Sequence, residues 1–100
     1  MLCALTVRKL KAGTFNEFRE AFMRFENKDN PPPGMTRFNM IRNASDPDEV
    51  VCFGFFDGTV DELRRVAAEA DYDKQVEAVA PFVESTGTDG LYEVVEEYTA

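Results

Sequence analysis

The chain has 100 residues, 44% of them hydrophobic and nine of them Phe, which is enough for one domain over residues 1–100 with a buried core. Its net charge is −8, and an acidic chain without a basic stripe repels phosphate backbones, which argues against nucleic acid as a partner. It shows neither a secretory signal nor an apolar run long enough to cross a membrane. We therefore expect no membrane partner and a cytoplasmic protein whose Cys3 and Cys52 are free thiols.

The first third of the chain predicts a strand and then a helix. Residues 2–11 alternate between apolar and polar side chains, which is typical of a half-buried strand. Thr14 and Glu17 have the spacing of a capping box at a helix start. Four aromatic side chains follow at helical steps of three and four residues: Phe15, Phe18, Phe22 and Phe25. The segment ENKDNPPPG, residues 26–34, ends this helix because three prolines and a glycine cannot continue it.

The middle of the chain predicts a β-hairpin. Residues 35–43 and 50–57 both have the pattern of strands, and the short segment ASDPDE, residues 44–49, connects them. The second of these strands, VVCFGFFD, is apolar on both faces. Antiparallel strands with one face in water usually alternate between apolar and polar residues, so both faces of this strand need a cover.

The last part predicts two helical segments and a final strand. Thr59 and Glu62 form a second capping box at a helix start. The segment ADYD, residues 70–73, interrupts the helix, and a further helical segment follows that should bend near Pro81. The polar segment STGTDG predicts a loop over residues 85–90, and residues 91–98 have the pattern of the last strand.

This order of elements is that of the ferredoxin-like βαββαβ pattern, an α+β fold. Right-handed crossovers give a four-stranded antiparallel sheet with the first and third strands central and the helices on one face. The helices leave the second apolar face of residues 50–57 open, and soluble monomers avoid such a patch. A second copy of the chain, packed sheet to sheet, would cover this face, so we expect a homodimer. In this sheet Cys3 lies far from Cys52, so we expect no disulfide between them.

The stretch from PPPG, residues 31–34, to APFV, residues 80–83, carries a family resemblance. Pro-Gly leads into a strand, Asp-Pro lies in the hairpin connection, and an apolar strand leads to a Thr-capped helix and a Tyr-led segment ending in AVAPFV. In this order and spacing the chain resembles the antibiotic biosynthesis monooxygenase-like domains of the dimeric α+β barrel superfamily. The resemblance implies a barrel formed by the two sheets of a dimer, with a small apolar ligand between sheet and helices.

The same resemblance suggests an activity and limits it. Members of the superfamily include cofactor-independent oxygenases of aromatic polyketides and quinols, and haem-degrading enzymes with a His ligand and a pocket Trp. Many members carry a histidine where this chain has Val66 or Asp71, and this chain has no His and no Trp, so the haem-degrading scheme does not fit it. Two separated cysteines without histidine leave no transition-metal cluster, and no cofactor motif is present. We therefore expect neither a metal nor a cofactor.

The hairpin provides the first candidate site, on the condition that Asn43 pairs with Val50. Asn39 then lies opposite Gly54, and an amide that faces a residue without a side chain makes a recess in the apolar sheet face. This amide could orient a substrate carbonyl or stabilise an enolate, which makes Asn39 a catalytic candidate. The substrate-binding candidates are Gly54 itself, Arg37 on the Asn39 face, and three residues that would line the recess: Ile41, Cys52 and Phe56. The alternative is that Gly54 marks a bulge or a close backbone approach, and that Asn39 is a satisfied polar group.

Tyr72 is the second catalytic candidate, because it follows the break between the two helical segments. Its hydroxyl could donate a hydrogen bond or act as a weak acid in a pocket. Alternatively, its ring packs against the protein while its hydroxyl meets water. Which face of the sheet carries the pocket stays open.

Three functions remain open from the sequence. The first is a cofactor-independent monooxygenase-like protein that handles a small apolar or aromatic substrate. The second is a non-catalytic module that binds a small molecule in the same pocket, and the third is a structural dimer with a filled core.

Overall fold

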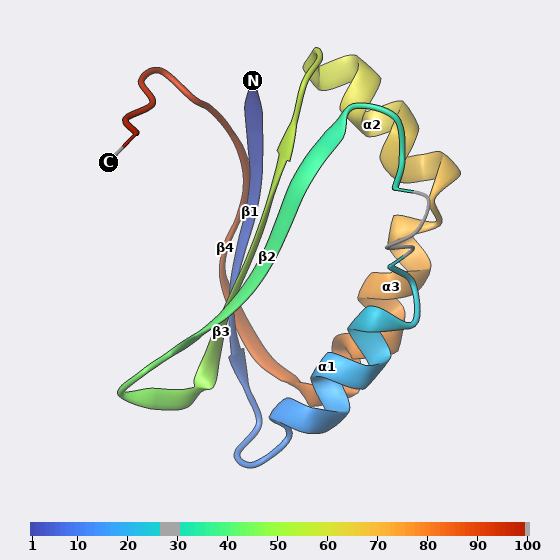
Figure 1. Ribbon diagram of the computed structural model, residues 1–100. Helices are drawn as coiled ribbons and strands as arrows, with labels where there is room; N and C mark the ends of the chain where they lie inside the picture. Colours follow the sequence, from blue (N-terminus) through green and yellow to red (C-terminus); the bar gives the residue numbers. More distant parts are fainter. Residues whose placement is uncertain (27–30, 100) are drawn as a thin grey trace.

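The computed structural model describes residues 1–26 and 31–99, and residues 27–30 of the predicted helix-ending segment lie outside this description. The elements follow in the order β1 (Leu2–Leu10), α1 (Phe15–Met23), β2 (Met35–Asn43), β3 (Asp46–Phe56), α2 (Val60–Glu69), α3 (Tyr72–Val79), the short 3₁₀ helix η1 (Ala80–Phe82) and β4 (Val83–Glu93). The strands form one antiparallel sheet in the order β2-β3-β1-β4, with the helices together on one face (Figure 1). The predicted α+β ferredoxin-like fold with β1 and β3 central is therefore confirmed.

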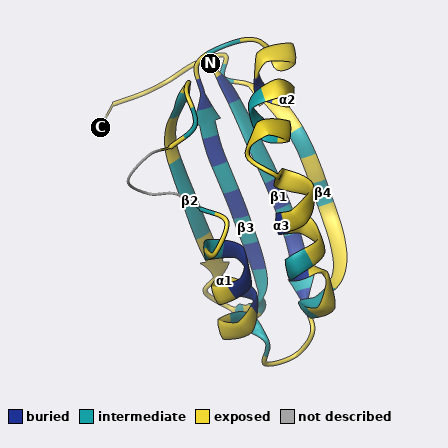
Figure 2. Cartoon of the chain, turned by 90° about the vertical axis from the view of Figure 1, so that its right-hand side faces the viewer, coloured by how far each residue is buried: buried dark blue, intermediate teal, exposed yellow. Residues whose placement is uncertain are grey.

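The core lies between the helices and the sheet. Figure 2 shows buried positions along β1 and β3 and on α1. Phe18 is fully buried and Phe22 is 4% exposed, so the predicted aromatic stripe is a core feature, although Phe25 follows the end of α1 and is exposed. Burial of such a side chain stabilises the fold by about 2 to 3 kcal/mol. A smaller cluster beneath α2 is made of Leu2, Phe56 and Leu63. Within residues 1–26 and 31–99, no helix has the length and apolarity to cross a membrane.

The hairpin between β2 and β3 differs from the prediction. β3 begins at Asp46 and not at residue 50, so the connection is only the turn at residues 44 and 45. Between the pairs Arg42–Val50 and Asn43–Asp46 the ladder shifts, because β3 carries extra residues there. The predicted pairing of Asn43 with Val50 is therefore wrong by one residue, and a slip of one residue moves side chains to the opposite face.

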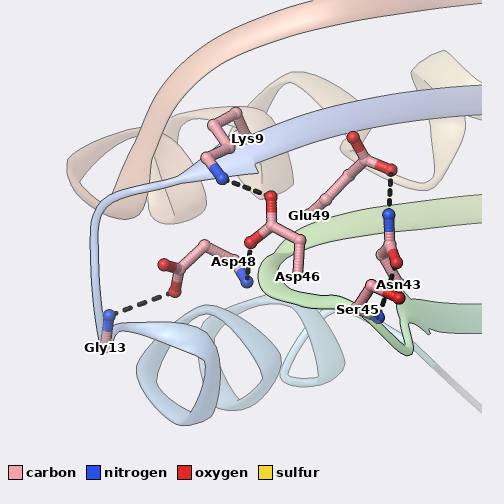
Figure 3. Close-up of polar contacts among 7 residues, drawn as sticks. All are labelled: Lys9, Gly13, Asn43, Ser45, Asp46, Asp48 and Glu49. Carbon is pink, nitrogen blue, oxygen red and sulfur yellow. Dashed lines mark hydrogen bonds and ion pairs between the residues drawn. The ribbon is translucent and has the colours of Figure 1, made fainter.

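Polar contacts fasten this irregular end of the hairpin to β1 and to the loop before α1 (Figure 3). Lys9 of β1 forms an ion pair with Asp46. The backbone N–H of Asp48 donates to Oδ1 of Asp46 over 3.0 Å, and the backbone N–H of Gly13 donates to Oδ1 of Asp48 over 3.1 Å. Across the turn, Nδ2 of Asn43 donates to Glu49 over 3.1 Å. These contacts hold the start of β3 beside β1, where the regular ladder is interrupted.

The last strand also differs from the prediction. β4 spans Val83–Glu93, so the predicted loop at residues 85–90 is part of a strand and the predicted strand at residues 91–98 is wrong beyond residue 93. Val7 pairs with Thr88 and Arg8 with Thr86, so Gly87 is the extra residue of a bulge. The backbone N–H of Val94 still donates to the carbonyl of Met1 over 3.0 Å before the chain leaves the sheet.

One of the two predicted capping boxes is confirmed. At α2 the Thr59 hydroxyl accepts from the backbone N–H of Glu62 over 3.2 Å, and the Glu62 carboxylate accepts in return from the backbone N–H of Thr59 over 3.3 Å. At α1 the Thr14 side chain makes no cap, and its hydroxyl donates to the carbonyl of Lys11 over 2.8 Å. The predicted break between the helical segments is confirmed at Asp71, whose φ of 56° is left-handed.

Candidate functional site between sheet and helices

The sheet register divides the predicted site residues between its two faces, because residues directly opposite each other share a face. Cys52 and Phe56 belong to the buried clusters under the helices, and Gly54 lies between them on the same face of β3. Asn39 pairs with Phe53, Ile41 with Val51 and Arg37 with Phe55, and these pairs occupy the outer face. Figure 1 shows this outer face turned away from all three α-helices. The structure therefore separates the predicted hairpin residues onto two faces of the sheet and does not form one site from them.

The predicted recess opposite Asn39 is absent. Phe38 lies opposite Gly54. A Cβ at Gly54 would lie 3.0 Å from Cε of Met35 and 3.6 Å from Cδ2 of Phe38, so these two side chains fill the space above the glycine. The alternative interpretation of a close backbone approach at Gly54 agrees with the carbonyl oxygen of Arg37, which would lie 3.4 Å from that Cβ. Asn39 accepts a hydrogen bond from Nε of Arg37 over 3.0 Å on the outer face. A role for Asn39, Arg37 and Ile41 in binding or catalysis stays a prediction that concerns this outer face.

Two open hollows lie at the end of the sheet where the chain begins. One has a volume of about 410 Å³ and is lined by Met1, Leu2, Gly58, Thr59, Val60, Glu93 and Val94. The other has a volume of about 370 Å³ on the outer face and is lined by Met1, Thr36, Arg37, Phe55, Val94, Glu96, Glu97 and Tyr98. Of the predicted site residues, only Arg37 borders either hollow. Neither of these hollows is lined by a buried charged residue.

A buried polar group under the helices is the feature that sequence reasoning missed. Thr6 and Arg8 of β1 are 8% and 6% exposed, and Nη1 of Arg8 donates to Oγ1 of Thr6 over 3.0 Å. Thr6 lies opposite Cys52 on β3 and opposite Asp89 on β4, so these three side chains form a row across the sheet. Tyr72, at the start of α3, completes the group. We call Thr6, Arg8, Cys52, Tyr72 and Asp89 the Arg8 cluster.

Within the Arg8 cluster, the pKa values of Tyr72 and Cys52 depend on neighbouring charged groups. Burial raises the pKa of the Tyr72 phenol, the negative charge of Asp89 raises it further, and the positive charge of Arg8 opposes both. Burial raises the pKa of the Cys52 thiol to about 11, again against the effect of Arg8. Both groups are therefore protonated at neutral pH and can donate hydrogen bonds. The cluster thus combines two neutral donors with a fixed cation and one carboxylate.

Exposed residues of β4 and α3 lie beside the Arg8 cluster. Asp89 and Leu91 face the helices, since they lie opposite Thr6 and Ala4, yet both are exposed. Leu91 is 39% exposed, Val76 of α3 is 40% exposed and Tyr72 is 36% exposed. Figure 2 shows β4 as largely exposed beside the α2–α3 line of helices.

A signal for Arg8 was present in the sequence. Arg8 shares a face with Ala4 and Thr6 on a strand that the topology makes central, and a charged residue is rarely fully buried unless it is paired.

Among residues 1–26 and 31–99, no group of three or more His, Cys, Asp or Glu side chains could hold a metal ion.

Comparisons with known proteins agree with the fold. No family model matches the chain, and no curated protein matches its sequence. Among solved structures, SnoaB, a cofactor-independent oxygenase from Streptomyces nogalater, is 18% identical with a TM-score of 0.78, over 96% of this chain and 94% of that one. A candidate antibiotic biosynthesis monooxygenase from Nitrosomonas europaea is 20% identical with a TM-score of 0.73, over 96% of this chain and all of that one. A further candidate from Chloroflexus aurantiacus is 10% identical with a TM-score of 0.76, over 98% and 96% of the two chains.

These likenesses define the class of fold. The chain has the fold of the solved antibiotic biosynthesis monooxygenases along nearly its whole length, which confirms the resemblance inferred from its sequence.

Proposed function

We propose that this protein is a cofactor-independent monooxygenase-like enzyme for a small aromatic substrate that binds between the sheet and the helices. The observation that carries the proposal is the convergence of Tyr72, Cys52 and Arg8 on the helix side of the sheet. The fold shared with SnoaB, which is itself a cofactor-independent oxygenase, supports the reaction type.

The reaction requires a substrate that supplies all the electrons. In an anthrone, the methylene between two rings loses a proton to give a delocalised anion, and this anion reacts with O₂ to give a hydroperoxide. Loss of water from the hydroperoxide leaves a carbonyl, so that one oxygen atom enters the substrate and the other leaves as water. The balance is R₂CH₂ + O₂ → R₂C=O + H₂O, in which the carbon gives four electrons and O₂ takes them.

The residues of the Arg8 cluster suit the first step. The Tyr72 hydroxyl, protonated at neutral pH, donates to the substrate oxygen on which the negative charge develops. The Asp89 carboxylate, on the same face of the sheet, accepts the methylene proton. The positive charge of Arg8 lowers the cost of placing an anion in this space.

Oxygen uptake with anthrone tests the proposal. Wild-type protein should consume O₂ above the rate without protein, and Tyr72→Phe should slow this by roughly tenfold to a hundredfold. Tyr92→Phe is the matched control, because Tyr92 lies opposite Cys3 on the outer face and is 49% exposed. The proposal is wrong if wild type consumes no oxygen above the blank, or if both variants behave alike.

A non-catalytic binding module is the second candidate function. It is favoured by the lack of a buried base in the Arg8 cluster, where Tyr72 and Cys52 are protonated and Asp89 is exposed. If this is the function, anthrone should raise the melting temperature of wild type without any oxygen uptake, because a ligand of the folded state stabilises it.

We also propose that the protein is a homodimer, in which two outer sheet faces pack together as a barrel. The outer face carries a continuous apolar row from three strands: Leu5, Val7, Val51, Phe53, Phe55 and Ile41. Ile41 is 49% exposed, and the rings of Phe53 and Phe55 meet edge to face at 6.0 Å without a covering layer from the helices. Sheet-to-sheet packing buries such a face in a second copy.

A further inference from the structure

We propose that the Arg8 cluster selects a substrate that carries a carboxylate, so that the substrate class is a small aromatic acid with its carboxylate on Arg8. This inference rests on the proposed function only for the place of binding between sheet and helices. It concerns what the site recognises and not what it then does to the substrate.

The first support is a buried positive charge that lacks a carboxylate partner. Arg8 is 6% exposed on a central strand, and a guanidinium keeps its proton in proteins. The ion pairs within residues 1–26 and 31–99 are Lys9–Asp46 and Lys74–Asp71, and neither involves Arg8. A buried charge without a partner costs folding free energy, and an anionic ligand would remove this cost.

The second support is the set of donors on the guanidinium. Its five N–H groups form a planar fork, of which Thr6 accepts one from Nη1 over 3.0 Å, and hydrogen bonding with Arg8 also acts on Tyr72 and Cys52. In the described part of the chain, every fully buried side-chain nitrogen has a partner. Donors of Arg8 that lack one are therefore those at its exposed edge. A planar fork with open donors matches the two oxygens of a carboxylate.

The third support is that the guanidinium is held in place. It lies over the rings of Phe18 and Phe22, 5.7 Å and 5.9 Å from their centroids. Phe22 in turn stacks on Phe38 with centroids 5.5 Å apart. A cation held over two aromatic rings loses little conformational entropy when it binds an anion, which favours the orientation of a bound ligand.

The surroundings select a carboxylate on an aromatic ring over a more highly charged anion. Exposed side chains of α3 and β4 on the helix side, Tyr72, Val76 and Leu91, offer aromatic and apolar surface to the body of a ligand. Asp89, opposite Thr6, is also exposed, and its negative charge disfavours a dianion such as phosphate more than a single carboxylate.

Calorimetric titration with a matched pair of probes tests this inference. 2-Naphthoate carries the carboxylate, and 2-naphthamide has the same rings and nearly the same shape without the charge. Wild-type protein at pH 7 should bind the naphthoate at least about tenfold more tightly, as expected for a hydrogen-bonded charge pair. Arg8→Gln should abolish this preference, and Arg8→Lys, which keeps the charge but not the fork, should keep part of it.

Arg42→Gln is the matched control for the loss of one positive charge. Arg42 also lies on the helix side of the sheet, with its guanidinium 4.5 Å from the centroid of Phe15, but it is exposed. This variant should bind both probes as wild type does. If Arg8→Gln does not fold, the ratio of the affinities for 2-naphthoate and 2-naphthamide, measured for wild type and for Arg8→Lys, still tests the inference.

Equal binding of the two probes by wild type, binding of neither, or a preference that persists in a folded Arg8→Gln variant would overturn the inference. The outcome is separate from that of the proposed function. A naphthoate preference without oxygen uptake in the presence of anthrone supports the inference and refutes the proposed reaction. Oxygen uptake without a naphthoate preference supports the proposed reaction and refutes the inference.

Discussion

At the scale of single residues, Phe56 depends on two glycines for its place in the smaller core cluster. A Cβ at Gly34 would lie 2.5 Å from Cε2 of Phe56, and a Cβ at Gly58 would lie 2.6 Å from its Cε1. The ring, 2% exposed, therefore fits against backbone on two sides. This packing explains why Phe56 is buried, and a role for Phe56 in ligand binding stays a prediction.

Gly34→Ala should destabilise the protein more than Gly13→Ala. Both glycines have positive φ, +89° and +75°, so alanine costs about 1 to 2 kcal/mol of backbone strain at either position. Only Gly34 adds a steric conflict, with Phe56, of about 1 to 3 kcal/mol, because nothing lies within 4 Å of a Cβ at Gly13. Urea unfolding of both variants measures the difference. Equal losses would show that the Phe56 contact relaxes without cost.

The burial of Arg8 could not be predicted from the sequence alone. The alternation of residues 2–11 places Arg8 on one face of a strand, but the pattern alone does not say that the helices cover this face. The pairings of Asn39 with Phe53 and of Phe38 with Gly54 were also out of reach. They follow from the shift between Arg42 and Asn43, at an end of the hairpin that contacts both Lys9 and Gly13 and is held across the turn by Asn43.

At the scale of elements, two identical motifs have different outcomes. Thr14 and Thr59 both precede a Glu by three residues, but only Thr59 has the extended backbone, with φ −88° and ψ 165°, that lets its hydroxyl reach the helix N–H groups. At α1 the adjoining loop directs the Thr14 hydroxyl to the carbonyls of Lys11 and Phe82 instead. A capping motif therefore predicts where a helix starts better than it predicts the capping contact.

Thr59→Ala should cost about 1 kcal/mol of stability, because the N–H of Glu62 at the start of α2 loses its acceptor. Thr59→Ser keeps the hydroxyl and should stay close to wild type. Chemical denaturation of the two variants provides the measurement. If serine and alanine destabilise equally, the methyl group and not the cap accounts for the effect of Thr59.

β4 was mispredicted because its residues are those of a loop. Gly87 and Gly90 with the polar residues between them have little preference for a strand. β1 nevertheless pairs along the whole of β4, and the bulge at Gly87 absorbs the extra residue. Tertiary pairing at a sheet edge thus overrides local preference.

The ion pair between β1 and β3 should make stability depend on pH. The hydrogen bond from Lys9 holds the pKa of Asp46 below its usual 3.8, and the same bond raises the pKa of Lys9 above 10.5. The contribution of Asp46 is complete above pH 3.8 and is lost as the pH falls through its lowered value. The contribution of Lys9 is complete below pH 10.5 and is lost as the pH rises through its raised value.

Asp46→Asn removes this dependence while keeping an acceptor for the N–H of Asp48. The melting temperature of wild type should exceed that of the variant near neutral pH, and the gap should close in strong acid. In a Lys9→Gln background the same substitution should have a smaller effect. A gap that is constant from neutral pH to pH 2 would show that Asp46 acts through the hairpin alone.

At the scale of the whole molecule, the order of elements was readable because each element carries its own pattern. Alternation over residues 2–11, the Phe steps of α1 and the apolar run of β3 led to one topology, which the strand order β2-β3-β1-β4 confirms. The site was less readable, because it depends on residues from β1, β3, β4 and α3 that meet only after folding. The apolar run VVCFGFF correctly predicted that the helices cover only one face of β3, because its outward-facing side chains have no cover from the helices.

The proposed homodimer predicts that Phe53→Glu is a monomer. Phe53 lies in the middle of the outer face, opposite Leu5 on one side and Asn39 on the other. A carboxylate there would be buried without a partner in each of two packed sheets, which costs more than the contact provides. Light scattering at micromolar concentration should give twice the chain mass of 11.3 kDa for wild type and the single chain mass for the variant.

Val60→Glu is the control, because it adds the same charge to an exposed residue at the start of α2, on the helix side. This variant should remain dimeric, because Val60 lies away from the outer face. Its fold should not suffer either, because a carboxylate in the first turn of a helix interacts favourably with the helix dipole. A wild-type mass equal to one chain would refute the dimer. The apolar outer face would then need a different cover, and the Arg8 cluster on the opposite face would be unaffected, because every residue in it belongs to one chain.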